Sequence, residues 1–149
     1  FKAAITIKKR FSDKVNNLSD VDILNLDIND LQSIGISLRK AYYIQNVYNY
    51  FHDSNFDFKS SCDKDIISEL TKIKGIGLWS AEMFLMFILM RINIFSLGDL
   101  ALMNSLKVNY KINIKDKDAV ESLIELWSPY KSVASLLLWK SIEEKYYYS

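Results

Sequence analysis

Apolar residues recur every three or four positions along most of this chain, a spacing that places them on one face of an α-helix. No strict alternation of polar and apolar residues runs long enough to indicate a β-strand. Helix breakers are also scarce, because the 149 residues include only one Pro and four Gly. The pattern therefore predicts an all-α fold.

Residues that favour helix ends divide this pattern into elements. Ser and Asp side chains accept hydrogen bonds at helix starts, and Gly35 favours a left-handed helix stop. The predicted capping residues are Ser19 and Asp20, Asp27, Ser37, Ser60 or Ser61, and Asp116. Pro129 is suited to open the last helix. The chain shows no repeat or linker, so we expect a single domain over 1–149. Because Phe1 begins inside an amphipathic helix pattern with no capping residue before it, we also expect that an upstream N-terminal segment is absent. The predicted helices cover residues 1–15, 21–26, 28–35, 38–51, 61–72, 79–91, 100–109, 117–127 and 129 onward.

The composition narrows the classes of function. Half of the residues are apolar and a quarter are charged, which is typical of a soluble globular protein. One Cys and one His exclude an internal disulfide, a Cys-based zinc or iron–sulfur site and a multi-histidine metal centre. The net charge is only +1, so nucleic acid would be bound by a local surface. The longest apolar run, Met83 to Met90, is too short to span a bilayer, and we expect no membrane association.

The segment from Leu70 to Ala81 carries the clearest candidate site. Gly75 and Gly77 flank one apolar residue between two predicted helices, which predicts a hairpin too tight for side chains at both positions. Backbone N–H groups at the start of the second helix would form an anion site suited to a DNA phosphate. Carbonyl groups on the other side of the hairpin could hold a monovalent cation. An ordinary helical turn with glycine stops is an equally good interpretation of these two glycines alone.

Four blocks of sequence resemble one enzyme family. They are Lys-Gly-Ile-Gly-Leu-Trp-Ser-Ala-Glu-Met-Phe at 74–84, the segment 91–101 ending in Gly-Asp-Leu-Ala, and the segments 34–41 and 127–139. Their order and spacing resemble the helix–hairpin–helix–Gly/Pro–Asp superfamily of DNA glycosylases, and within it the 3-methyladenine DNA glycosylase II family. The resemblance covers nearly the whole chain and implies an all-helical fold with the helix–hairpin–helix at about 63–91.

The resemblance implies a catalytic role for Asp99, which matches the family's catalytic aspartate. A carboxylate there can stabilise the positive charge that develops on the sugar and orient a water molecule. The alternative is that Asp99 only caps the following helix. Trp79 stands where bifunctional relatives carry a Schiff-base lysine, so the resemblance implies a monofunctional enzyme that uses water as its nucleophile.

The resemblance also implies that Trp79 and Trp139 line the pocket for the damaged base. Alkylated purines are cationic, and aromatic walls attract cations by stacking and cation–π contact. The alternative for both residues is core packing, a common fate of Trp on an apolar helix face. Trp127 is expected to pack beside Pro129.

Further residues are expected to contact DNA. Leu38 matches a position where relatives place a side chain that wedges into the duplex, although it would also fit a hydrophobic staple at a helix start. Lys131 stands where the family usually has arginine, which keeps the charge but loses bidentate phosphate binding. The carbonyls of Thr71, Ile73 and Gly75 are expected to line a site for sodium or potassium. The expected DNA-binding residues are Leu38, Arg39, Lys74, Gly75, Gly77 and Lys131.

Together these features predict a monofunctional DNA glycosylase that removes damaged, alkylated bases of the 3-methyladenine type. Its expected partner is double-stranded DNA that contains a damaged base, and it is expected to act as a monomer inside the cell. No cofactor is expected apart from the structural monovalent cation. A non-catalytic or degenerate helix–hairpin–helix DNA-binding module is the alternative.

Overall fold

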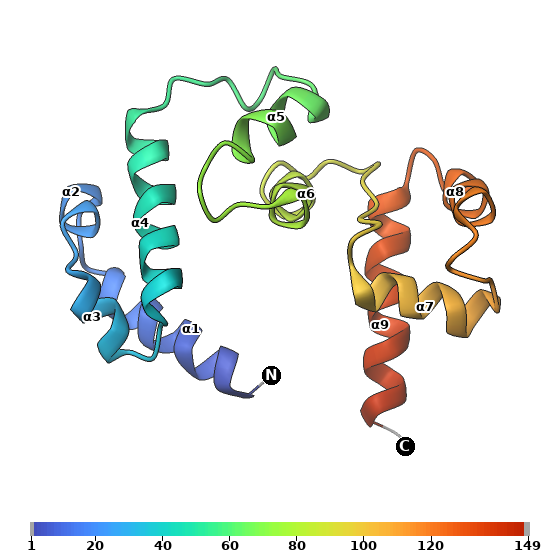
Figure 1. Ribbon diagram of the computed structural model, residues 1–149, viewed down its shortest axis with the longest axis horizontal. Helices are drawn as coiled ribbons and strands as arrows, with labels where there is room; N and C mark the ends of the chain where they lie inside the picture. Colours follow the sequence, from blue (N-terminus) through green and yellow to red (C-terminus); the bar gives the residue numbers. More distant parts are fainter. Residues whose placement is uncertain (1, 148–149) are drawn as a thin grey trace. The chain divides into compact units, whose positions relative to one another are not determined.

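The chain folds into α-helices. The structure is a computed structural model that describes residues 2–147, and it contains no β-strand in that range, so the prediction of an all-α fold is confirmed. No helix within these residues is both long and apolar enough to cross a bilayer. The helices, shown in Figure 1, are α1 (Lys2–Val15), α2 (Asp20–Leu24), α3 (Ile28–Ser33), α4 (Leu38–Asp53), α5 (Asp63–Leu70), α6 (Leu78–Phe87), α7 (Leu100–Tyr110), α8 (Lys117–Glu125) and α9 (Lys131–Tyr147).

The helices belong to two compact units. Unit 1 holds the chain up to Asp57 together with Glu69–Ile76. Unit 2 holds Phe58–Ser68 and the chain from Gly77 onward. The single domain over 1–149 therefore stays a prediction, while each unit has a core of its own.

Unit 1 is organised around α4. Helices α2 and α3 pack against α4, and the buried core is formed by Leu31, Ile36 and Ala41. Gly35 follows α3 with a φ of 98°, a left-handed conformation that favours glycine, so it ends this helix as predicted. The turn at Gly35 leads directly into the first turn of α4, which carries Leu38 and Arg39.

Most helix starts in unit 1 use the capping residues that the sequence predicts. Ser19 and Asp22 form a reciprocal capping box at α2. The Asp27 carboxylate accepts the N–H of Asn29 at 2.9 Å at the start of α3. Ser37 occupies the N-cap position of α4, but its side chain makes no capping hydrogen bond. The position predicted for the start of α4 is therefore right, whereas the bond expected from Ser37 does not form.

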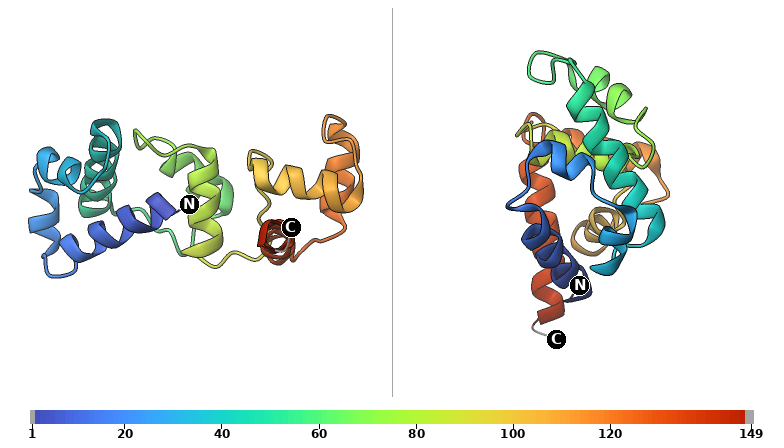
Figure 2. Two further views of the ribbon diagram at one scale, coloured as in Figure 1. Left: turned by 90° about the horizontal axis from the view of Figure 1, so that it is seen from below. Right: turned by 90° about the vertical axis from the view of Figure 1, so that its left-hand side faces the viewer.

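Unit 2 is organised around the packing of α7 across α9, which can be followed in Figures 1 and 2. The hydroxyl of Ser105, which is fully buried in α7, donates to the carbonyl of Leu138 in α9 at 3.0 Å. This bond satisfies a buried polar group and fixes the two helices against each other. The core around it consists of Leu102, Leu106, Val120, Ile124 and Leu138.

Helix α6 is shorter than the apolar pattern predicts. It ends at Phe87 rather than at Arg91, because the Arg91 N–H turns back to the Leu85 carbonyl at 2.9 Å. Met90 lies within this turn in the left-handed conformation, with a φ of 54°. Glycine is the residue that adopts this left-handed conformation most readily. The apolar run continues after the helix has stopped, so the pattern alone misplaces the end.

The last helix begins later than predicted. Pro129 lies before α9, which starts at Lys131. The Tyr130 N–H donates to the Trp127 carbonyl at 2.6 Å, and the Tyr130 carbonyl accepts the first helical bond from Ala134 at 3.1 Å. Helical bonding therefore begins at Tyr130, and Pro129 belongs to the turn that precedes it.

Candidate functional site

The Asp99 carboxylate is the centre of a hydrogen-bonded cluster in unit 2. Its Oδ2 accepts the indole N–H of Trp79 at 2.8 Å. Its Oδ1 accepts the backbone N–H of Leu102 at 2.9 Å and the indole N–H of Trp139 at 3.3 Å. Only 8% of Asp99 is exposed to solvent. We call Asp99, Trp79 and Trp139 the Asp99 site.

Three helices supply the Asp99 site. Trp79 lies in the first turn of α6, Asp99 is the N-cap residue of α7, and Trp139 lies on α9. Asp99 caps α7 in the way the sequence predicts, and the two indoles bind the same carboxylate. The structure therefore brings together three predicted residues separated by 20 and 40 positions in the chain. The functional roles of the three residues stay predictions.

The surroundings of Asp99 favour its ionised form. Burial raises the pKa of the carboxyl, but four donors act against it: the backbone N–H groups of Leu102 and Ala101 and the indoles of Trp79 and Trp139. Their combined effect outweighs burial, and the pKa of Asp99 is lowered below its ordinary value of 3.8. The site therefore holds a buried negative charge at neutral pH.

A second carboxylate that sequence reasoning missed lies beside this site. Glu82 accepts a hydrogen bond from the hydroxyl of the fully buried Ser96, whose carbonyl accepts the Asp99 N–H at 3.2 Å. Burial raises the pKa of Glu82 and the charge of Asp99 adds to this effect, whereas the bond from Ser96 opposes it. Glu82 lies three residues after Trp79 on α6, and side chains at this spacing are neighbours on a helix surface. This spacing is the sequence signal that could have identified Glu82.

Apolar side chains surround the Asp99 site on the surface. Phe87, at the end of α6, stacks on Trp139 with ring centroids 6.0 Å apart and an interplanar angle of 25°. Half of Trp79 is exposed, and Leu97 and Leu100, which flank the Gly98–Asp99 turn, are exposed as well. Core packing therefore describes Trp139 in part, since it contacts the core of unit 2, but it does not describe Trp79.

Gly75 meets the prediction of a tight turn. Its φ is 113°, a backbone conformation that residues with a side chain rarely adopt, and a Cβ there would lie 2.3 Å from Cγ of Tyr43. Gly77 does not meet it. Its φ is −97°, and no atom lies within 4 Å of an added Cβ, so neither the backbone nor the space around it requires glycine. The expectation that both positions exclude side chains is wrong for Gly77, because this residue is already at the N-cap of α6 and faces open space.

The predicted cation ligands lie in the turn that follows α5. The carbonyl of Ile73 accepts the N–H of Ile76 at 3.0 Å, which leaves one of its two lone pairs for another partner. The carbonyls of Thr71 and Gly75 belong to the same short turn. Among residues 2–147, no group of three His, Cys, Asp or Glu side chains could hold a metal ion, so backbone oxygens are the ligands to consider in this turn.

Three of the residues predicted to contact DNA line one pocket in unit 1. Leu38 and Arg39 from α4 and Lys74 from the turn form its walls together with Tyr42, Tyr43 and Asn46, and its volume is about 440 Å³. We call this cavity the α4 pocket. The Asn46 side-chain amide donates to the Lys74 carbonyl at 3.0 Å and ties the turn to the helix. Sequence reasoning missed Tyr42, Tyr43 and Asn46, although their i+4 and i+7 spacing from Leu38 and Arg39 indicates a shared face.

Lys131 has a different environment from Arg39 and Lys74. Only 17% of its side chain is exposed, and its ammonium group pairs with Glu125. The hydrogen bond from Lys131 lowers the pKa of the Glu125 carboxyl below its ordinary value. A DNA phosphate would have to compete with this carboxylate for the ammonium group. The predicted DNA contact of Lys131 stays a prediction.

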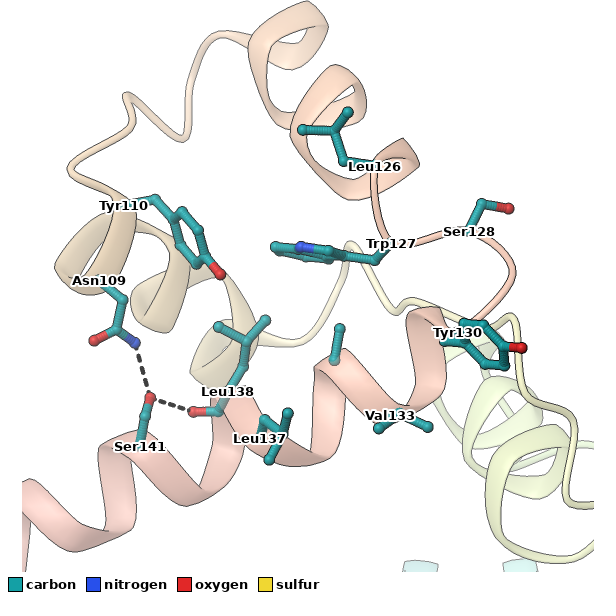
Figure 3. Close-up of a pocket in the computed structure, with 11 residues that line it drawn as sticks. Asn109, Tyr110, Leu126, Trp127, Ser128, Tyr130, Val133, Leu137, Leu138 and Ser141 are labelled. Atoms are coloured by element: carbon teal, nitrogen blue, oxygen red, sulfur yellow. Dashed lines mark hydrogen bonds between the residues drawn. The ribbon is translucent and has the colours of Figure 1, made fainter.

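Unit 2 has a separate cavity beside α7 and α9, with a volume of about 730 Å³ (Figure 3). Trp127 forms one wall and packs against Tyr110 with ring centroids 5.6 Å apart. Leu137 and Leu138 line another side. Asn109 and Ser141 form the polar end of the cavity, where the Asn109 side-chain amide donates to the Ser141 hydroxyl at 2.8 Å. None of the residues of the Asp99 site lines this cavity, so its size does not make it the candidate active site.

Comparison with known proteins finds relatives that are named as DNA-3-methyladenine glycosylases, putatively so for the first described here, although no family model matches the chain. The Bacillus subtilis (strain 168) protein YfjP is 38% identical over 125 residues, which are 81% of this chain and 44% of YfjP. The crystal structure of a DNA-3-methyladenine glycosidase from Bacillus halodurans has a TM-score of 0.78 and 33% identity, and the match covers 95% of this chain and 68% of that one. The Schizosaccharomyces pombe 3-methyladenine DNA glycosylase Mag1, in complex with abasic DNA, has a TM-score of 0.84 and 27% identity over 95% of this chain and 73% of Mag1. The chain spans about half the length of the curated relatives it matches.

Proposed function

The chain belongs to the DNA-3-methyladenine glycosylase family, and on that premise we propose that it hydrolyses the N-glycosidic bond of damaged, alkylated bases in DNA. We further assign it, as one domain, to the 3-methyladenine DNA glycosylase II family within the helix–hairpin–helix–Gly/Pro–Asp superfamily. The observation that carries the proposal is the buried, ionised Asp99 carboxylate with two indole donors. Such a reaction is the first chemical step of base excision repair.

Asp99 provides the charge that this hydrolysis needs. When the bond between C1′ and the base nitrogen breaks, its electron pair leaves with the base and the sugar becomes positively charged. A fixed carboxylate stabilises this charge and holds a water molecule, whose oxygen bonds to C1′ while its proton passes to solvent. The indole donors of Trp79 and Trp139 keep the carboxylate oriented and ionised before substrate arrives.

The enzyme we propose is monofunctional. Trp79 offers no amine, so no Schiff base with the sugar can form at this position. Base release should therefore leave an intact strand that breaks only after alkali treatment. Borohydride should trap no covalent protein–DNA adduct, and an adduct through Lys72 or Lys74 would contradict this assignment.

The damaged base is proposed to lie against Trp79 and Trp139. Half of the Trp79 ring is exposed, which leaves an aromatic surface beside the carboxylate. A cationic alkylated purine gains both stacking and cation–π attraction on such a surface. Lesions of the 3-methyladenine type fit this chemistry better than neutral oxidised bases.

Double-stranded DNA containing a damaged base is the proposed partner. Arg39 and Lys74 provide positive charge, and Leu38 provides an exposed apolar side chain at a helix start. Gly77 leaves open space at the N-terminus of α6, where a phosphate could approach the backbone N–H groups. Gly75 and Lys131 complete the proposed DNA-binding set.

A monovalent cation, sodium or potassium, is proposed at the turn after α5. The carbonyl oxygens of Thr71, Ile73 and Gly75 are hard ligands of the kind that such cations prefer, and Ile73 retains a lone pair for this use. A bound cation there would steady the turn and add positive charge near a phosphate. We also propose that the protein acts as a monomer and works where the cell keeps its DNA.

The test of the proposed function is base release from methylated duplex DNA by this chain. Release of 3-methyladenine that Asp99→Asn abolishes is the expected result. Tight binding of the same duplex without any release would instead identify a non-catalytic DNA-binding module. The absence of both binding and release would overturn the proposed function.

A further inference from the structure

We propose that the α4 pocket binds one unstacked nucleotide next to the gap left by the damaged base, with Tyr42 stacked on its base. This inference rests on the proposed function, since it assumes that the chain binds DNA from which a base has left the stack. It assigns a role to Tyr42, Tyr43 and Asn46. The nucleotide comes either from the strand opposite the lesion or from the position beside the lesion.

The placement of Tyr42 supports a contact with a base. Tyr42 follows Leu38 by four residues on α4, so the two side chains lie one turn apart on the same face. Both line the pocket, and 51% of Tyr42 and 48% of Leu38 are exposed. If Leu38 fills the gap in the duplex, the ring of Tyr42 is the next surface that a displaced base meets. Aromatic rings at such positions stack on bases of any sequence.

The pocket is built before any ligand arrives. The Tyr43 ring lies against Gly75 so closely that even a methyl group there would overlap it. The Asn46 amide holds the Lys74 carbonyl at 3.0 Å. These two contacts join α4 to the turn at Lys74 and at Gly75. The walls therefore keep their spacing, and a ligand does not have to order them.

The charges of the pocket suit a phosphate. Arg39 and Lys74 line it, and no acidic side chain does. In the described part of the chain, neither cation has an ion pair, whereas Lys14, Lys72, Arg91 and Lys131 do. A pocket lined by an aromatic ring and two such cations matches a nucleotide, which combines a flat base with a negatively charged phosphate.

Photocrosslinking with 5-iodouracil tests this inference. The base is placed in a duplex that contains a stable abasic analogue, in one arm opposite the analogue and in the other arm next to it on the same strand. Irradiation should crosslink the full chain at Tyr42 in one of the two arms, and that arm identifies the source of the nucleotide. Tyr42→Phe should keep the crosslink, because the ring remains, and Tyr42→Ala should lose it.

Affinity provides the second measurement. Tyr42→Ala should weaken binding to the duplex with the abasic analogue about ten-fold and leave binding to an intact duplex unchanged, because only the abasic position lets a base leave the stack. Phe51→Ala is the matched control. It lies nine residues further along α4, on the opposite face, with a similar exposure of 41%, and it should change neither affinity.

The outcomes separate this inference from the proposed function. Crosslinks at other residues in both arms, or equal losses of affinity for the abasic-analogue and intact duplexes, would overturn the role of Tyr42 while base release by the parent chain still supports the enzyme. Base release that depends on Asp99, together with unchanged affinity of Tyr42→Ala for the abasic-analogue duplex, would also overturn the inference alone. A chain that binds no duplex at all would remove both.

Discussion

The Asp99 site in unit 2 and the α4 pocket in unit 1 differ in what their polar groups already contact. The Asp99 carboxylate is buried, and the indole N–H groups of Trp79 and Trp139 and the backbone of α7 already donate hydrogen bonds to it. Arg39 and Lys74 line their pocket and form no ion pair with another described residue, and Tyr42 is half exposed. The polar groups of the Asp99 site are therefore hydrogen-bonded within the protein before a ligand binds. The charged groups of the α4 pocket are left for a ligand to pair with.

This difference separates two tasks. A charge that must act on a short-lived cationic sugar is most effective when its surroundings are arranged in advance. Groups that bind a phosphate backbone add most to the affinity when binding displaces only solvent from them, and no bond within the protein is lost. The comparison predicts that changes at the Asp99 site affect base release more than affinity, and that changes at the α4 pocket do the reverse.

The largest expected effect comes from Asp99→Asn. The amide retains one oxygen for capping α7 but loses the charge, and its NH₂ group would face an indole N–H donor. We expect base release in single-turnover assays to fall by at least about 100-fold, with affinity for damaged duplex within a few fold of the parent. Asp116→Asn is the matched control, because Asp116 also caps a helix, and it should leave release unchanged.

The acid limb of the pH profile tests the state of Asp99 itself. Because its pKa is lowered, activity that needs the carboxylate should persist as the pH falls and disappear only below about 3.8. The stabilising contribution of the ionised form is present above the ordinary pKa and is lost as the pH falls through the lowered value. Trp79→Phe removes one lowering donor and should move this limb to higher pH. An unchanged limb would show that the Trp79 bond does not hold the charge.

The second largest effect is expected at Gly75. Gly75→Ala places a methyl group against Tyr43 in a conformation that side chains rarely adopt, and should cost about 2 kcal/mol or more in the free energy of unfolding. A thermal melt should show a decrease of about 4–8 °C in Tm. Gly77→Ala is the matched comparison. It should melt like the parent and yet weaken binding to damaged and undamaged duplexes alike, since a phosphate approaches there.

A smaller effect is expected at the aromatic walls. Trp139→Ala should slow release of cationic 3-methyladenine about ten-fold more than release of neutral hypoxanthine, because a cation loses both stacking and cation–π attraction. Trp139→Phe should recover part of the loss. Equal losses on both substrates with a lower Tm would instead assign Trp139 to the core that it also contacts.

The smallest effect is expected at Met90. This exposed residue has a left-handed backbone conformation, which glycine adopts without the steric cost of a side chain, so Met90→Gly should stabilise the chain by about 0.5–1 kcal/mol. Chemical denaturation measures the change, and base release should be unaffected. A loss of release with gained stability would show that the Asp99 site depends on the stiffness of this turn.

Local pattern was sufficient for the elements of the fold. Three-to-four-residue spacing and capping residues predict each helix found in residues 2–147, and the resemblance points to Asp99, Trp79 and Trp139 before any coordinates are known. The errors concern ends and turns. Helix α6 stops four residues early although its apolar run continues, and α9 begins after Pro129 because Tyr130 first closes a turn with Trp127.

The sequence by itself determined what each helix is and which residue types it can offer, because capping and periodicity act within a few residues. The tertiary structure decided which of those residues share an environment. It gave Asp99 indole donors from 20 and 40 positions away, and it placed Lys131 beside Glu125. It also assembled Tyr42, Tyr43 and Asn46 with Lys74. Hydrogen bonds, burial and pKa depend on groups that packing brings within a few ångströms, and no local pattern in the chain records those distances.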